Sequence, residues 1–384
     1  MRWSSIVAPI LLTTIQLFNC DPLDKNENDQ RLNSCGKMMQ SKVYQGRDAQ
    51  QSEAPWSVFF LNKKPPNAQG QIFSTTCTGT VVSPRHVLFA THCFADLQDD
   101  ASWKMNGARD DSNCKDDDYV ITDKSFLEGM ELQSNGVMIA DRPEKVTMVN
   151  GCLKRTADKT KAYQPLTPQY FTDDFAIIDL YEDLKFSNTL QAVCIAKDST
   201  VNQVSTSLEY YGFGLNPPSD KSTNDAEDNS GKLRHETIKV IDKPMEDYYF
   251  IAGSENKKTV ACVGDSGGGA IGTINGKKTI VGVLSQTNCA DEKKRIDPIE
   301  QYASVGYYNE RICQLTGICN SQQDHEKYHK DYVKKEKPVR PTKAPIVQNP
   351  DGVQVQRPVG VEPDAASEKY MFMTLVLTFV ALMI

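Results

Sequence analysis

The stretch Gly264-Asp265-Ser266-Gly267-Gly268-Gly269 sets one serine among glycines, directly after an acidic residue. Serine is a weak nucleophile unless a neighbouring base takes its proton. Glycines beside it let backbone N–H groups approach a negatively charged oxygen closely. The stretch therefore predicts a nucleophilic serine on a loop, and it requires a base and an acid from elsewhere in the chain.

Two further motifs supply these groups. Leu88-Phe89-Ala90-Thr91-His92-Cys93 is an apolar strand that ends in histidine, and Asp174 opens the apolar run Phe175–Leu180. An imidazole can take the serine proton, and a shielded carboxylate can fix the imidazole tautomer. Asp173 and Asp179 are alternative candidates for this carboxylate, and the pattern Asp-Phe-Ala-Ile-Ile favours Asp174. The other four histidines lack such a setting and are interpreted as structural.

Short β-rich runs dominate residues 43–320. Trp56–Leu61 and Thr279–Leu284 are examples, and Gly, Pro, Asn and Asp separate the runs. Short strands with frequent turn signals favour a sandwich or a barrel. Only Tyr308–Leu315 has the pattern of a short helix.

The motifs around His92, Asp174 and Ser266, in that order, resemble the trypsin/chymotrypsin family of serine peptidases over about residues 35–315. The segment Glu27–Gly36 is similar to a divergent trypsin-like group of nematodes. The resemblance implies an all-β fold with two six-stranded antiparallel β-barrels and the active site in the cleft between them. It also implies a serine endopeptidase that works through an acyl-enzyme without a cofactor.

The family also implies an oxyanion hole and an activation step. Gly264 and Ser266 would donate the N–H groups of the oxyanion hole. Cleavage after Lys42 by a trypsin-like protease would free the amino group of Val43 to pair with Asp265. A buried ion pair is costly unless both partners are present, so the uncleaved chain should be a zymogen.

The resemblance places a specificity pocket at four positions. Val260 stands where a trypsin carries aspartate, and Ser285 and Thr287 belong to the wall. An apolar floor and a narrowed wall favour small or medium apolar side chains. Glu300 would instead favour a basic side chain if it reaches the base of the pocket. Both specificities remain open at this point.

The chain holds 11 cysteines, which indicates an oxidising compartment. Residues 1–20 have the pattern of a signal peptide, and its removal would leave ten cysteines. The family implies the pairs Cys77–Cys93, Cys262–Cys289 and Cys35–Cys194. The pairs left over are Cys114–Cys152 and Cys313–Cys319.

The domain organisation follows from these features. Residues 21–42 would be a propeptide tethered by disulfide, and 43–320 the protease domain. Residues 321–369 are rich in proline and lysine and are predicted to be a disordered stalk. Residues 370–384 are a hydrophobic tail, interpreted as a GPI-attachment signal, a short membrane segment or neither. We therefore expect a secreted protein, with attachment to a membrane through the tail as the alternative.

Composition limits the partners. Net charge is −7, which argues against nucleic acid. The long interval between His92 and Asp174 implies an insertion within 95–165, whose acidic residues favour a solvated loop over a metal site. The expected partners are protein or peptide substrates, and the expected state is a monomer. The rival hypothesis is a catalytically silent, protease-like binding protein, which the unusual sequence at Val43 supports and the complete set of three motifs opposes.

Overall fold

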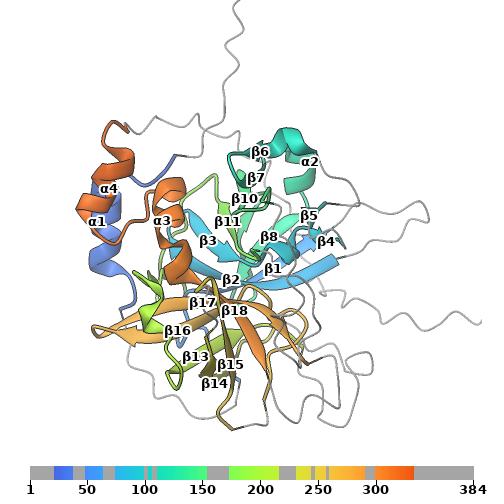
Figure 1. The fold of residues 1–384 in the computed structure, drawn as a ribbon. Helices are drawn as coiled ribbons and strands as arrows, with labels where there is room; N and C mark the ends of the chain where they lie inside the picture. The colour runs from blue at the N-terminus through green and yellow to red at the C-terminus, as the bar shows by residue number, and fades with distance from the viewer. Residues whose placement is uncertain are drawn as a thin grey trace, which may run out of the picture. The chain divides into compact units, whose positions relative to one another are not determined.

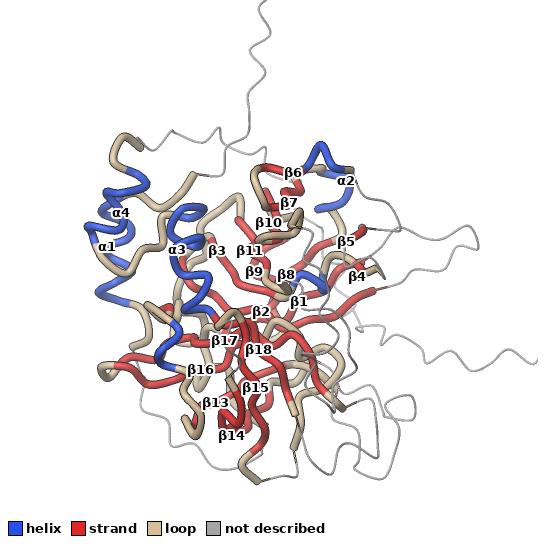
Figure 2. Tube along the Cα trace, in the orientation of Figure 1, coloured by secondary structure: helices blue, strands red, loops and turns tan. Residues whose placement is uncertain are grey.

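The computed structural model describes residues 21–37, 48–63, 74–98, 103–105, 110–153, 173–215, 231–243, 247–256, 259–289 and 299–332. Strands predominate over helices in this part of the chain (Figure 1, Figure 2). Residues 1–334 form one unit and 335–384 a second. The predicted signal peptide, the Lys42–Val43 bond and the hydrophobic tail lie outside the described residues.

The first sheet has nine strands in the order β6-β7-β10-β11-β3-β2-β1-β8-β9. The count exceeds the six expected for a barrel because the stretch 95–165 supplies strands at both edges of the sheet. The strands are β1 Ser57–Lys63, β2 Ser74–Ser83, β3 His86–Phe89, β6 Cys114–Lys115, β7 Asp118–Ile121, β8 Met130–Ser134, β9 Val137–Asp141, β10 Lys145–Met148 and β11 Ala176–Asp179.

The second sheet contains a closed barrel of six antiparallel strands. β17 pairs with both β16 and β18, which closes the ring β13-β14-β15-β18-β17-β16, and β12 adds a short parallel strand. The strands are β12 Cys194–Ile195, β13 Ser207–Gly212, β14 Arg234–Asp242, β15 Tyr249–Ser254, β16 Gly269–Ile274, β17 Lys277–Thr287 and β18 Glu300–Ser304. The prediction of an all-β, trypsin-like fold is confirmed; among the described residues one of its two sheets closes into a six-stranded barrel, and the other is a nine-stranded sheet.

Apolar runs in the sequence become strands that are buried on both faces. Val87 and Phe89 of β3 belong to the core of the first sheet, whereas Leu88 between them belongs to a core shared with the second sheet. Side chains alternate along a strand, so a continuous apolar run is needed where both faces are covered. This packing holds β3, and the loop that follows it, rigidly between the two sheets.

Helices lie mainly at one side of the molecule (Figure 1). The sequence predicts one near Tyr308–Leu315, and α3 spans Val305–Thr316. The other helices are α1 Lys25–Ser34, α2 Lys124–Leu127 and α4 Gln322–His329. Short 3-10 turns at Thr91–Cys93, Asp111–Asn113 and Ser199–Val201, and the small pair β4 Asp96–Leu97 and β5 Trp103–Lys104, complete the fold.

The N-terminal helix α1 packs against α4 near the end of the described chain. Arg31 is buried and donates from Nη2 to the carbonyl of Cys319 at 2.7 Å. His325 Nε2 lies 2.8 Å from the carbonyl oxygen of Leu23. Residues 321–332, which were predicted to belong to a disordered stalk, are therefore folded and include α4. A polar sequence forms α4 because its contacts with α1, nearly 300 residues away, replace a hydrophobic face of its own.

Five disulfides join the described cysteines. They are Cys35–Cys194, Cys77–Cys93, Cys114–Cys152, Cys262–Cys289 and Cys313–Cys319, the same five pairs that the sequence analysis names. Cys35–Cys194 closes the longest loop, 159 residues, and ties α1 to β12. A cross-link of this kind contributes about 2–4 kcal/mol, mainly by restricting the unfolded chain.

Candidate active site

His92 and Asp174 lie together just after the end of β3 and just before the start of β11. The register pairs Ala176 with Phe89, so the residues just beyond both strand ends come together. His92 Nδ1 lies 2.7 Å from Asp174 Oδ2, and the His92 backbone N–H donates to Asp174 Oδ1 at 3.0 Å. One carboxylate thus holds both the ring and the backbone of the histidine.

Ser285 makes a third contact with this carboxylate. Its Oγ donates to Asp174 Oδ2 at 2.6 Å, and the residue is buried. The sequence analysis placed Ser285 in the wall of the specificity pocket. The hydroxyl faces the acid and supports its charge, a contact that the sequence did not predict. Ser285 lies on β17, so the contact also ties the second barrel to the first sheet.

His92 and Asp174 shift each other's pKa in opposite directions. Burial by itself lowers the pKa of His92, but the charge and hydrogen bond of Asp174 outweigh it and leave that pKa raised. Burial raises the pKa of Asp174, and its contacts with His92 and Ser285 reverse the direction, so that pKa is lowered. Asp174 is therefore a carboxylate at neutral pH, and it favours the tautomer with the proton on Nδ1.

The competing acids have other partners. Asp173 accepts hydrogen bonds from Tyr308 Oη at 2.6 Å and from Asn150 Nδ2 at 3.1 Å. Asp179 Oδ1 lies 3.2 Å from His86 Nε2. Neither acid contacts His92 in the part of the chain that the structure describes.

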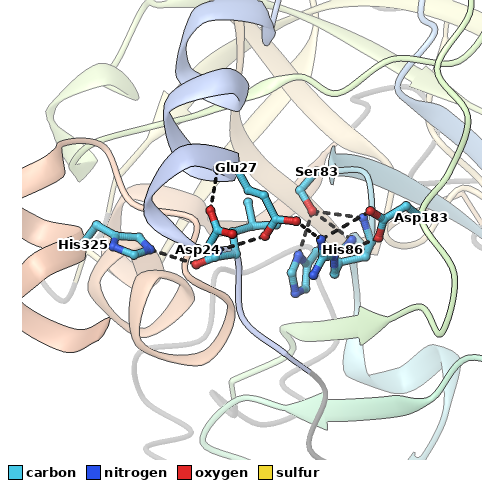
Figure 3. Close-up of polar contacts among 8 residues, drawn as sticks. Asp24, Glu27, Ser83, His86, Asp183 and His325 are labelled. Carbon is cyan, nitrogen blue, oxygen red and sulfur yellow. Dashed lines mark hydrogen bonds and ion pairs between the residues drawn. The ribbon is translucent and has the colours of Figure 1, made fainter. Parts of the chain in front are cut away.

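His86 has a serine and an acid of its own. Its Nδ1 lies 2.7 Å from Ser83 Oγ (Figure 3), opposite the contact of its Nε2 with Asp179. Ser83 and His86 are 0% exposed, so no substrate could reach them. The structure thus gives His86 a structural setting.

Ser266 lies on the loop between Cys262 and β16. Its carbonyl oxygen accepts the N–H of Thr78 at 2.9 Å and lies 3.8 Å from Sγ of Cys93, the residue after His92. The serine is partly exposed. Within the described residues Ser266 and His92 share no hydrogen bond, and such contacts in substrate-free enzymes are often loose.

Gly267 is required by the shape of this loop. Its φ is +85°, and a Cβ atom there would lie 2.3 Å from the carbonyl oxygen of Thr78. Any other L-residue would be strained in that conformation and would push the loop away from β2. The glycine therefore fixes the distance between the Ser266 loop and β2, and a Cβ there would also lie 3.2 Å from the backbone N of Ala90, two residues before His92.

Two amides of the loop have no acceptor in the part of the chain that the structure describes. The N–H groups of Asp265, Gly267 and Gly268 donate to backbone carbonyls. Among the described residues, the N–H groups of Gly264 and Ser266 donate to no protein acceptor. Backbone amides without an internal acceptor, on either side of a nucleophile, are the groups that an oxyanion hole uses.

Asp265 points into the protein. Its Oδ1 accepts the N–H of Gly214 at 2.8 Å, and its Oδ2 accepts the N–H of Cys262 at 2.7 Å. Burial outweighs these bonds and raises the pKa of Asp265 to about 7. Its predicted partner, Val43, lies outside the described residues.

The other predicted pocket residues lie at the rim of the second barrel. Val260 is partly exposed, and Thr287 Oγ1 donates to the carbonyl of Ala261 at 2.7 Å. Glu300 is 0% exposed and accepts the N–H of Ala261 at 2.8 Å. Glu300 therefore lies behind the segment that holds Val260, not at an open pocket base.

Comparison with known proteins places this site in a family. The model of the nematode trypsin-6-like family matches residues 5–319, which include all the groups described above. The chain belongs to the nematode trypsin-6-like family. This trypsin-6-like chain is also similar to the CLIP domain-containing serine protease B4 of Anopheles gambiae, with 23% identity over 274 residues. The match covers 66% of this chain and 64% of the mosquito protein.

Neither a metal site nor a membrane span is found in the described part of this trypsin-6-like chain. No three His, Cys, Asp or Glu side chains gather there in a way that could hold a metal ion. None of its described helices is long and apolar enough to cross a membrane. The sequence analysis missed the contact of Ser285 with Asp174 and the burial of Glu236 beside Glu300, because both depend on how distant strands pair.

Proposed function

We propose that the chain is a secreted serine endopeptidase made as a zymogen. The observation that carries the proposal is that the Asp174 carboxylate contacts both the ring Nδ1 and the backbone N–H of His92. The Ser266 loop lies against β2, and two of its amides donate to no acceptor among the described residues. A binding protein would have no need for this combination.

In the proposed reaction, His92 Nε2 takes the proton of Ser266 Oγ as the oxygen attacks the carbonyl carbon of the substrate. The amides of Gly264 and Ser266 stabilise the oxyanion. His92 then gives the proton to the leaving amine, which breaks the peptide bond and leaves an acyl-enzyme. Water, activated by the same imidazole, hydrolyses the ester. Asp174 holds the ring in the correct tautomer and stabilises the imidazolium.

Activation would follow a cut after Lys42 by a protease of trypsin-like specificity. Asp48, five residues beyond Val43, forms a β-bridge with Arg234. Arg234 Nη1 donates to the carbonyl of Gly214 at 2.6 Å, and the Gly214 amide donates to Asp265. Five residues of extended chain span up to about 17 Å. The anchored position of Asp48 is therefore compatible with a Val43 ammonium that reaches the buried Asp265 carboxyl.

The proposed setting is extracellular. Five disulfides are stable in an oxidising compartment, and residues 1–20 have the pattern of a signal peptide. Treating cells with a phosphoinositide-specific phospholipase would distinguish release into the medium from attachment through residues 370–384.

Labelling of the active site tests the proposed function. The protein, expressed without residues 1–20 and 370–384, is cut with trypsin and treated with a fluorophosphonate probe. We expect labelling only after cleavage at Lys42–Val43. Ser266→Ala should abolish it, and Ser187→Ala, at an exposed turn, should not. Folded, correctly cut protein that stays unlabelled would refute the protease and favour the binding protein.

A further inference from the structure

Thr78 on β2 contacts the Ser266 loop with both its backbone and its side chain. Its N–H donates to the carbonyl of Ser266 at 2.9 Å, and its Oγ1 donates to the carbonyl of Gly264 at 3.0 Å. The same Oγ1 accepts the N–H of Phe213 at 3.0 Å, and Thr78 is 0% exposed. A hydroxyl has one proton to donate and can also accept. This buried hydroxyl therefore joins the first sheet to the loop and to the chain that follows β13.

The peptide plane between Gly264 and Asp265 is held on both sides. Its carbonyl accepts from Thr78 Oγ1, and its N–H donates to the carbonyl of Cys262 at 2.9 Å. The φ of Gly264 is +95°, a conformation that glycine adopts readily because it has no Cβ. The same freedom lets the backbone turn easily at this position. The hydroxyl of Thr78 therefore restrains a peptide plane that has little intrinsic stiffness.

The two amides proposed for the oxyanion hole belong to the peptide planes on either side of this one. The first plane has its carbonyl on Val263, which accepts the N–H of Leu215 at 2.8 Å. The second has its carbonyl on Asp265, which accepts the hydroxyl of Tyr210 at 2.6 Å. Tyr210 lies on β13 and Leu215 follows it, whereas Thr78 holds the plane between them from the first sheet.

Thr78 also lies beside the part of the chain that carries the proposed base. Cys77, the residue before it, is disulfide-bonded to Cys93, the residue after His92. The contacts of Thr78 therefore set the position of the oxyanion amides relative to His92. Donors that are in place before charge develops on the substrate oxygen stabilise the transition state more than the bound substrate.

We propose, on the basis of the proposed function, that the Thr78 hydroxyl is a positioning group for the oxyanion hole, and that it raises kcat without contacting the substrate. Without the hydroxyl, the carbonyl of Gly264 and the N–H of Phe213 lose this buried partner. The Gly264 peptide can then turn, and its amide loses alignment. Removal of an oxyanion donor lowers kcat by about 10²–10³-fold, so a misaligned donor should cost about 10–100-fold.

Three variants separate the hydroxyl from its surroundings. Thr78→Val keeps the size of the side chain and removes the hydroxyl, whereas Thr78→Ser keeps the hydroxyl. Thr80→Val is the matched control, because Thr80 lies on the same strand, is also 0% exposed, and has an Oγ1 without a hydrogen-bond partner in the described chain. Thr78→Ala is the second variant without the hydroxyl, should Thr78→Val fail to fold.

Each protein is cut at Lys42–Val43, and complete fluorophosphonate labelling counts its active sites, so that rates refer to folded enzyme. With a peptide anilide that the wild type hydrolyses, Thr78→Val should lower kcat by about 10–100-fold and leave KM nearly unchanged. Thr78→Ser and Thr80→Val should stay within about threefold of the wild type.

Inhibitor binding adds a measurement that a merely structural role would not change. Ser266 Oγ adds to the carbonyl carbon of a peptide trifluoromethyl ketone, its proton passes to His92, and the carbonyl oxygen becomes an oxyanion. The matching alcohol cannot undergo this addition. Thr78→Val should raise the Ki of the ketone by the same factor, about 10–100-fold, and leave the Ki of the alcohol unchanged.

The outcomes distinguish this role from the proposed function. A Thr78→Val enzyme with the kcat of the Thr80→Val control would overturn the positioning role, and so would equal weakening of both inhibitors. A Thr78→Ser enzyme as slow as Thr78→Val would overturn the assignment to the hydroxyl. Cut wild-type protein that stays unlabelled would refute the proposed function and this role together.

Discussion

The buried carboxyl of Asp265 should make the uncleaved chain less stable as pH rises. The pKa of this group is raised from 3.8 to about 7. A raised pKa means that the folded chain binds more protons than the unfolded chain between these two values. The contribution of Asp265 to stability is therefore fully present below about pH 4, falls as pH rises through this window, and is lost above about pH 7. This rise in the pKa of Asp265 corresponds to about 4 kcal/mol of unfolding free energy.

The variant Asp265→Asn removes this titration. The amide oxygen of asparagine can accept only one of the two N–H groups, from Gly214 or from Cys262. Its NH₂ group then faces the other N–H, which costs about 1–3 kcal/mol of unfolding free energy. The variant should thus be less stable than the parent at pH 4 by about that amount. At pH 8 it should be more stable by about 1–3 kcal/mol, so the two curves cross.

Urea unfolding between pH 4 and pH 8, followed by tryptophan fluorescence, measures both curves in a Lys42→Gln background that trypsin cannot cut at this site. Glu182→Gln, whose acid is at an exposed position, serves as the control for a lost surface charge. After cleavage of a Lys42 protein, the Val43 ammonium should lower the pKa of Asp265 and reverse the effect of the variant at pH 8. Parallel curves for the parent and Asp265→Asn would refute the reasoning.

Three other predictions concern the site and its scaffold. Asp174→Asn should lower kcat by several orders of magnitude, because an amide favours the wrong imidazole tautomer, while stopped-flow binding of a substrate changes little. In the parent, kcat/KM should fall as pH drops through the raised pKa of His92, since protonation removes the base, and a pH–rate profile without that acid limb would contradict the assignment. Gly267→Ala, with a Cβ 2.3 Å from the Thr78 carbonyl oxygen and φ at +85°, should abolish fluorophosphonate labelling, whereas Gly276→Ala, at an open turn with a similar φ of +74°, should keep it.

The N-terminal segment illustrates how far local signals extend. The sequence contains a capping box, in which Asp24 and Glu27 bond each other's backbone N–H groups at 2.9 Å, so the start of α1 could have been found from sequence. The packing of α1 against the rest of the chain could not have been found from sequence. Arg31 is buried and donates to the carbonyl of Cys319, 288 residues away, and nothing in the local sequence indicates that contact.

Sequence by itself determined the class of this protein: an all-β chain of the trypsin-like family, with His92, Asp174 and Ser266 in motifs whose local pattern carries the signal, and cysteines whose pairing follows from the family. Tertiary structure decided what each remaining polar group does. Ser285 supports Asp174 across 111 residues, and Glu300 lies behind Ala261 across 39. Such contacts depend on barrel closure and strand register, which bring together residues that have no local relation in the chain.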